Sequence, residues 1–215
     1  MTRTTTAVAL AAVAALALSP AASHAQTVPT PGIVGHGLEL RPFAGGFLPT
    51  GAQRDLLKDA AAFGGQLGWR FHENFAVTGT FAWAPSKDKT TAFRSGLPSA
   101  LYTGREEDLD VFDYNLGLEA RLPIAVSPSW VVAPYVGVGG GARSYHYRDV
   151  AGAGTETNPV GYGALGIDLA PSSGPIGVRF EARDNVSGFK GLRGENAERK
   201  ARNDVQLAGG ITFRF

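Results

Sequence analysis

The sequence predicts an all-β fold, an eight-stranded antiparallel up-and-down β-barrel that crosses a membrane, and three observations predict it. Apolar and polar residues alternate at every second position in segments of about ten residues, which is the period of a strand with one apolar and one polar face. The connections between these segments are alternately long and short, as in membrane barrels. An apolar run near the N-terminus is typical of exported proteins.

The composition points to one domain and excludes several kinds of chemistry. With 215 residues the chain is long enough for a single core. Cysteine is absent, which excludes disulfides, cysteine metal sites and thiol catalysis. The 20 basic and 19 acidic residues nearly balance, so nucleic acid is not expected as a partner. No cofactor is expected.

Residues 1–25 are predicted to be a secretory signal peptide. A basic residue precedes an apolar run of twelve, and small residues stand just before a cleavage site near Ala25. The alternative is an N-terminal anchor helix, although the run is shorter than the ~20 residues that span a bilayer. Residues 26–36 are rich in proline and glycine and are predicted to be a periplasmic linker, and residues 37–215 are predicted to form the barrel.

Eight strands are predicted within the barrel domain. The last one shows the pattern most clearly, because Val205, Leu207, Ile211, Phe213 and Phe215 alternate with small or polar residues. The predicted strands are residues 37–47, 61–71, 75–84, 108–122, 130–144, 159–170, 176–183 and 204–215.

The connections predict how the barrel sits in its membrane. Long connections follow the first, third, fifth and seventh strands, and short turns follow the second, fourth and sixth. This pattern places the long connections outside and the short turns, with both chain ends, in the periplasm. A helical turn is expected over 53–60, in the first long connection. Closure leaves no backbone group unpaired in lipid, where each exposed group would cost several kcal/mol.

The two faces of the strands predict a polar interior and an apolar exterior. Charged residues of both signs fall on the inward positions, which suggests a salt-bridged lumen: Glu39, Arg41, Arg70, Asp113, Glu119, Arg121, Asp168, Arg179, Glu181, Arg183 and Arg214. Aromatic residues fall near both ends of the outward face, as in the girdles of membrane barrels. The predicted girdle residues are Trp69, Phe71, Phe75, Trp83, Phe112 and Trp130, with Phe63, Phe213 and Phe215 beside them.

Two segments carry a resemblance to a known family. The segment Pro-Tyr-Val-Gly-Val-Gly at 134–139 and the C-terminal Gly-Gly-Ile-Thr-Phe-Arg-Phe resemble strands of the bacterial outer-membrane β-barrel domain family. Over residues 37–215 the chain is similar to the small OmpA/OmpX-type barrels. The resemblance implies an outer-membrane location, and it implies that Phe213 and Phe215 form the signal read by the barrel-assembly machinery.

Several local patterns resemble binding or catalytic sites. The run from Gly137 to Ala142 matches G-x-G-x-x-A, but no helical pattern follows, so glycines facing a narrow lumen explain it better than a dinucleotide site. A cluster of acids could bind a divalent cation, although a solvated loop end is the simpler interpretation. These acids are Glu106, Glu107, Asp108 and Asp110.

Two further patterns bear on lipid. Ser144 and His146 could serve a lipid hydrolase as nucleophile and base, although their strand parity turns them toward lipid and no triad spacing supports catalysis. The last long connection is basic and could contact lipopolysaccharide phosphates, with a solvated loop as the alternative. Its basic residues are Lys190, Arg193, Arg199, Lys200 and Arg202.

The sequence therefore favours a non-enzymatic, monomeric outer-membrane barrel with a structural, envelope-integrity or surface-interaction role. Its expected partners are outer-membrane lipid, lipopolysaccharide and, during insertion, the assembly machinery. The first alternative is a narrow channel or small-ligand carrier, because many inward positions are small. Less favoured are an outer-membrane lipid hydrolase and a soluble lipocalin-like barrel with the faces inverted.

Overall fold

The computed structural model describes residues 36–89, 107–148, 155–187 and 201–215. The predicted signal peptide, and the predicted linker apart from His36, lie outside these ranges. The elements are β1 Gly37–Thr50, the 3₁₀ turn η1 Gly51–Gln53, β2 Ala60–His72, β3 Phe75–Asp88, β4 Glu107–Arg121, β5 Ile124–Ser127, β6 Trp130–Tyr147, β7 Glu156–Pro171, β8 Ile176–Ser187 and β9 Arg202–Arg214. Within the described ranges, no helix is long and apolar enough to cross a membrane.

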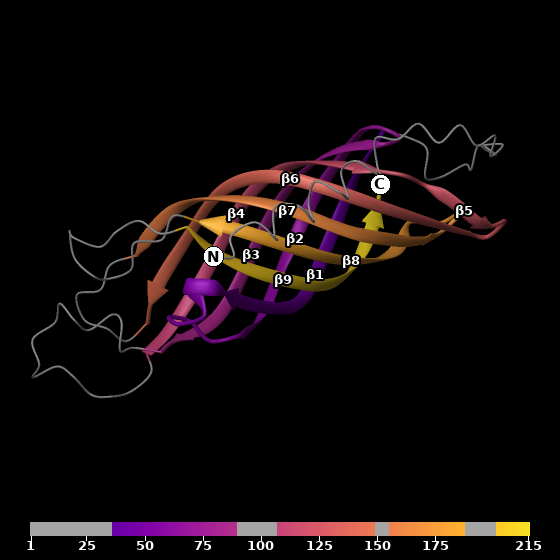
Figure 1. Ribbon diagram of the computed structural model, residues 1–215. Coiled ribbons are helices and arrows are strands. Elements are labelled where there is room, and N and C mark those ends of the chain that lie inside the picture. The colour runs from indigo at the N-terminus through magenta and orange to yellow at the C-terminus, as the bar shows by residue number, and fades with distance from the viewer. Residues whose placement is uncertain (1–35, 90–106, 149–154, 188–200) are drawn as a thin grey trace, which may run out of the picture.

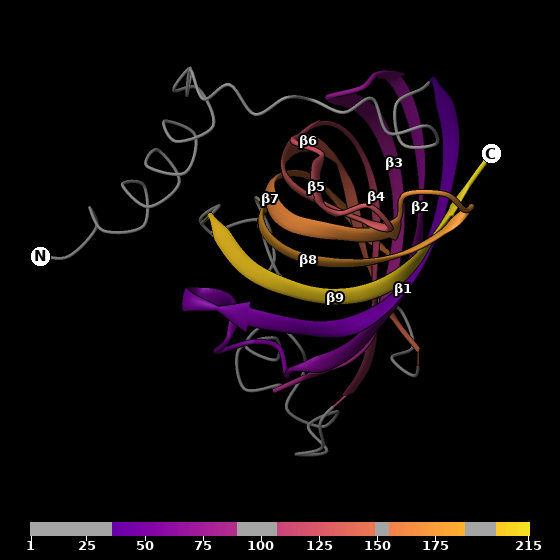
Figure 2. The same ribbon diagram turned by 90° about the vertical axis from the view of Figure 1, so that its right-hand side faces the viewer.

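The strands form one closed antiparallel barrel. Each long strand pairs with its neighbours along the chain, β4 pairs with β6, and β9 returns to pair with β1 (Figure 1). Figure 2, turned toward one end of the barrel, shows the strands curling around a common axis. We call the end with the connections 73–74, 122–129 and 172–175 the turn end, and the opposite end the loop end. The predicted eight-stranded up-and-down barrel is confirmed.

The strand register fixes the tilt of the barrel. A row of paired residues starts at Leu38 on β1, passes once around all eight long strands, and returns to β1 at Leu48, ten residues further along. A shear of this size in eight strands requires a strand tilt of about 43°. The radius is then about 8 Å, so inward side chains from opposite walls meet.

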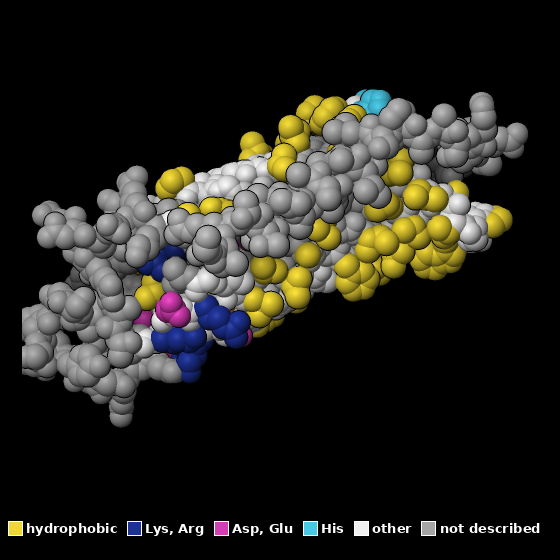
Figure 3. All heavy atoms as spheres, in the orientation of Figure 1, with side chains coloured by type: hydrophobic (Ala, Val, Ile, Leu, Met, Phe, Trp, Pro, Cys, Tyr) yellow, Lys and Arg dark blue, Asp and Glu magenta, His cyan; other side chains and the backbone are white. Residues whose placement is uncertain are grey.

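The alternation of side chains produces two different surfaces. Large apolar residues point outward on every long strand and are about half exposed, among them Leu40, Leu67, Phe81, Leu116 and Phe180. In Figure 3 hydrophobic side chains lie along the visible barrel wall, and Lys, Arg, Asp and Glu gather at its left, the loop end where η1 lies in Figure 1. Polar residues point inward and are mostly buried.

The predicted strand ranges are too short at the loop end. The ranges 75–84, 130–144 and 176–183 are observed as Phe75–Asp88, Trp130–Tyr147 and Ile176–Ser187. Polar residues such as Lys87, His146 and Asp184 interrupt the outward positions there, so the regular apolar alternation ends although backbone pairing continues. The helical turn expected over 53–60 is the shorter η1 followed by hydrogen-bonded turns.

The segment 123–129, predicted as a turn, contains the additional strand β5. Pro123 interrupts the line of β4, but Leu122 N donates to Pro134 O (2.9 Å), and β5 continues pairing with β6 in the same register as β4. Strand β5 is therefore an extension of β4 beyond the end of β3.

Candidate functional site

The barrel interior is the most elaborate polar feature of the described chain. The structure places all eleven charged residues predicted for the lumen inside the barrel. Nine are buried residues, and the side chains of Glu181 and Arg214 are 8% and 7% exposed. Their arrangement forms layers along the axis.

Glu39 is the centre of the layer nearest the turn end. Its carboxylate is fully buried and forms an ion pair with Arg41, two residues further along β1. Arg70 Nε lies 3.1 Å and Arg121 NH1 3.3 Å from Oε1, and Arg214 Nε lies 3.6 Å from the same oxygen. One carboxylate therefore joins β1, β2, β4 and β9.

Glu119 is the second centre, on β4. Arg41 NH1 (3.1 Å), Arg121 NH2 (2.9 Å) and Arg179 NH2 (2.5 Å) all reach its carboxylate. Arg179 also contacts Asp168 through NH1 (3.2 Å). Because these arginines are shared between acids, the ion pairs form one continuous network across the lumen.

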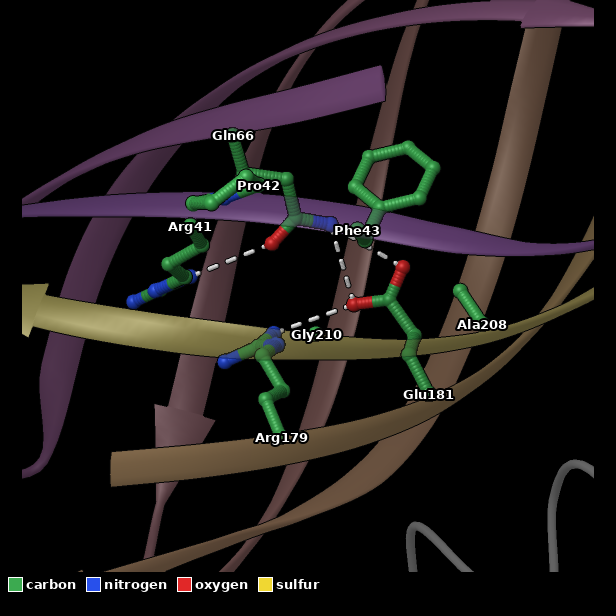
Figure 4. Close-up of a pocket in the computed structure, with 8 residues that line it drawn as sticks. All are labelled: Arg41, Pro42, Phe43, Gln66, Arg179, Glu181, Ala208 and Gly210. Carbon is green, nitrogen blue, oxygen red and sulfur yellow. Dashed lines mark hydrogen bonds and ion pairs between the residues drawn. The ribbon is translucent and has the colours of Figure 1, made fainter. Parts of the chain in front are cut away.

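Gln66 connects this network to Glu181. Figure 4 shows the Gln66 amide between Arg41 and Glu181: its Oε1 accepts from Arg41 NH1 (3.3 Å), and its Nε2 donates to both oxygens of Glu181 (3.1 and 3.2 Å). Arg179 NH2 and Tyr135 OH donate to the same carboxylate at 3.0 and 2.8 Å. The cavity between these groups has a volume of about 10 Å³, which is room for about one water molecule.

Arginines outnumber acids in this network, and tyrosine rings accommodate two of them. Arg179 Cζ lies 3.7 Å from the ring centroid of Tyr135, and Arg183 Cζ lies 4.1 Å from that of Tyr162. Cation–π attraction is strongest where the cation is removed from water. The network consists of Arg41, Arg70, Arg121, Arg179, Arg183 and Arg214 against Glu39, Glu119, Asp168 and Glu181.

A second layer, toward the loop end, is centred on Arg143, which is not among the residues predicted for the lumen. Its fully buried guanidinium pairs with Asp113 through Nε (2.6 Å) and NH2 (2.9 Å), and with Asp204 on the opposite side. Asn185 Nδ2 also donates to Asp204 (2.9 Å). Arg143 shares the parity of the inward Tyr135, but it lies at the end of the predicted strand, where the outward apolar pattern has ended.

The loop end is closed by apolar side chains. The connection after β1 turns into the barrel, so that Leu56 and Leu57 pack among residues of five strands. Gln53 Nε2 donates to Tyr145 OH (3.3 Å), and Lys58 N donates to Lys87 O (2.9 Å) on β3. We call this cluster the plug; its members are Phe47, Leu56, Leu57, Ala62, Ala84, Leu109, Val111, Tyr145 and Tyr147.

The glycine run at 137–142 lies within β6 and accommodates a tyrosine. A Cβ at Gly139 would lie 2.6 Å from Cε1 of Tyr162, and Gly117 on β4 meets the same ring. The run continues as strand, whereas a dinucleotide site needs a helix to hold its pyrophosphate. These inward glycines make room for the ring.

Two of the four acids of the suggested cation site, Asp108 and Asp110, have other partners. Glu106 lies outside the described residues. Asp108 contacts Lys87 Nζ (3.4 Å), and Asp110 accepts from Arg148 and from Trp83 Nε1 (2.7 Å). Among the residues that the structure describes, no group of three or more His, Asp or Glu could hold a metal ion.

Ser144 and His146 both face outward but bond to different partners. Ser144 Oγ lies 2.8 Å from Thr157 Oγ1, and His146 Nδ1 lies 3.1 Å from Thr155 Oγ1. Each contact joins β6 to a threonine, Thr157 in β7 or Thr155 just before it. The basic residues 190–200 of the last long connection lie outside the described residues, and Arg202 begins β9.

The predicted girdle residues lie outward near the two ends. At the turn end Phe71 lies 6.0 Å from Trp69 and 6.3 Å from Phe75, between ring centroids. At the loop end Phe63 packs 6.1 Å from Trp83. The other girdle rings are Phe112, stacked on Phe81, and the half-exposed Trp130. Phe215 is 79% exposed, and its N–H donates to Leu38 O (3.0 Å).

Comparison with known proteins extends these findings. The sequence matches the family model described as outer membrane protein beta-barrel domain over residues 8–214. No curated protein matches the chain. The fold is similar to the crystal structure of Neisserial surface protein A (NspA), with 14% identity, a TM-score of 0.55, and 83% of this chain and 97% of that one covered. It also resembles the N-terminal β-barrel domain of Pseudomonas aeruginosa OprF, with 11% identity, a TM-score of 0.48, and coverage of 83% and 97%.

Proposed function

Because the chain belongs to the outer membrane protein beta-barrel domain family and is thus an outer-membrane protein, we propose that it works as a closed barrel that neither conducts nor catalyses. Its role is to strengthen the envelope and to present its outer connections at the cell surface. The observation that carries this proposal is the filled lumen, where the ion-pair network, the Arg143 layer and the plug follow one another along the axis.

The packing of the lumen supports the absence of a pore. Eight strands enclose an interior that side chains can just fill. The cavity beside Gln66 holds about 10 Å³, whereas a hydrated ion would need a continuous path past Glu39, Arg143 and Leu57, which are all fully buried. A narrow channel or ligand carrier would require that side chains of all three layers move.

The partners of the polar groups support the absence of catalysis. The interior acids are held by arginines, and Ser144 and His146 bond to threonines of the β7 segment rather than to each other. A hydrolase would need a nucleophile within reach of its base.

The partners proposed for the barrel follow from its surfaces. The apolar wall fits outer-membrane lipid. Exposed Lys87 and Arg148 stand above the wall at the loop end, where lipopolysaccharide phosphates would lie. Phe213 and Phe215 end the last strand, where the assembly machinery would recognise them. A closed barrel with no free edge along its eight long strands suits a monomer. The chain would reach the outer membrane by export, with cleavage of the signal peptide near Ala25.

Planar-bilayer recording tests the proposed function. The purified barrel, refolded into detergent and checked by heat-modifiable gel migration, should give no stable conductance step. A porin inserted into the same membranes is the positive control. A reproducible porin-like step would contradict the proposal and favour the channel alternative.

A further inference from the structure

The barrel register allows the height of every outward residue to be compared. With a tilt of about 43°, each residue along a strand rises about 2.4 Å along the axis, and each step around a paired row rises about 3 Å. The row from Leu38 to Leu48 therefore climbs about 24 Å, close to the height of an apolar band.

Asp184 is an acid on the lipid-facing side of this band. On β8 it stands between the inward Arg183 and Asn185, so its own side chain points outward. In the row of paired residues that starts at Leu38, Asp184 lies between Gly163 and Val205 and is reached after six of the eight steps around the barrel. This places Asp184 about 18 Å above Leu38 and about 6 Å below Leu48.

The opposite wall is apolar at the same height. On β4, Leu118 belongs to this row, and Tyr114 lies four residues above it, about 19 Å above Leu38; Tyr114 is 49% exposed. On β8 the side chain at that height is a carboxylate that accepts a hydrogen bond from the Asn203 side chain. The two walls therefore present different chemistry to the same depth of the outer leaflet.

The apolar walls also differ in length. The outward residues of β4 and β5 are apolar from Phe112 to Val126, which lies fourteen residues further along the chain, a span of about 34 Å of height. Those of β8 run only from Ile176 to Ala182 before Asp184 interrupts them, about 14 Å. The apolar band of outer-membrane barrels is about 25 Å tall, so the short wall does not match it.

We propose that this barrel thins the outer leaflet locally along β8 and β9, where lipid headgroups and water descend to Asp184 and Asn203. A charged group in hydrocarbon is costly, and thinning of the bilayer is one way by which membranes relieve that cost. The tall wall of β4 to β6 has no such interruption and keeps the leaflet at full thickness. The lipid-facing apolar wall is therefore short at β8 and tall at β4 and β5.

Spin labels on single cysteines test this asymmetry, because the chain has no cysteine of its own. Val186 on β8 and Phe112 on β4 both face outward at about 23 Å above Leu38. In vesicles, the measured quantity is the rate at which a label collides with a water-soluble nickel complex divided by the rate at which it collides with oxygen. This ratio should be at least about threefold higher at Val186→Cys than at Phe112→Cys. Adding Asp184→Val should bring the Val186 label close to the Phe112 value.

Each other outcome overturns the proposal. Equal collision ratios at the two positions would mean that the leaflet is uniform. An unchanged ratio at Val186 after Asp184→Val would mean that the acid does not draw water down. Disulfide formation between two Val186→Cys copies would show that a second copy covers this face instead of thinned lipid. Heat-modifiable migration confirms that each variant is folded.

Discussion

At the scale of single residues, Glu39 determines whether the lumen tolerates its charges. Its buried carboxylate faces Arg41, Arg70, Arg121 and Arg214. Replacing a whole buried ion pair by apolar groups can be neutral, but removing one partner leaves an uncompensated charge in a low dielectric. Glu39 is therefore the carboxylate whose loss affects the most arginines.

The variant Glu39→Gln should lower the free energy of unfolding by about 3 kcal/mol or more, since the neutral amide leaves the guanidinium groups to repel one another. Urea titration in lipid vesicles measures it. The matched control is Asp59→Asn, an exposed acid at the loop end, which should change stability by less than about 0.5 kcal/mol. Equal effects of the two variants would show that the network is not cooperative.

The lumen is also sensitive to added volume. Gly139→Leu should destabilise the barrel by about 2 kcal/mol or more, because the new side chain meets Tyr162 and the backbone of β4. The control is Gly79→Leu on the outward face, where nothing lies within 4 Å and lipid can receive the side chain. Thermal unfolding of both in the same detergent compares them. If Gly79→Leu costs as much, packing around Tyr162 is not the reason.

At the scale of elements, the periodic strands were predictable and the layers that fill the barrel were not. Alternation identifies a strand such as β9 because one face meets lipid and the other meets polar side chains. Arg143 was not predicted because the outward apolar residues that reveal which positions face inward end before it. The plug was missed because Leu56 and Leu57 are apolar residues in a connection, and only the closed barrel shows that they turn inward.

The plug is expected to stabilise the barrel without being the sole barrier to ions. Leu57→Asp places a carboxylate in a fully buried apolar cluster and should reduce stability by about 3 kcal/mol. Conductance should remain absent, since the Arg143 layer and the ion-pair network lie beneath. Chemical denaturation and bilayer recording on the same preparation check both statements. Conductance appearing in this variant would make the plug the gate of a channel.

The end of β9 separates recognition from stability. Deleting Phe215 should change the stability of the refolded barrel by less than about 1 kcal/mol, because its side chain is 79% exposed in the protein itself. In cells the same deletion should greatly reduce the heat-modifiable, membrane-inserted form if the residue is read by the assembly machinery. The control is Val126→Ala, which truncates another exposed apolar side chain, in β5 rather than at the C-terminus. Normal insertion without Phe215 would remove its proposed role.

At the scale of the whole molecule, the two faces of the barrel wall meet different environments. The exterior presents apolar groups to lipid, and the interior replaces water with its own ion pairs, amides and rings. An eight-stranded barrel has a single radius, so this polar filling must be complete within a fixed volume. That requirement explains why glycine and tyrosine, or glycine and arginine, face each other across neighbouring strands: Gly166 with Tyr135, and Gly68 with Arg41.

The pairing of β1 with β9 has a consequence for the order in which the protein can form. Leu48 and Val205 are paired neighbours on adjacent strands although more than 150 residues separate them. Until the last residues of the chain have been synthesised, β1 has no second neighbour and presents an open edge. Contacts this distant in sequence slow folding and leave edges that aggregate. The barrel can therefore close only when the whole chain is present, in one late step that joins its first strand to its last.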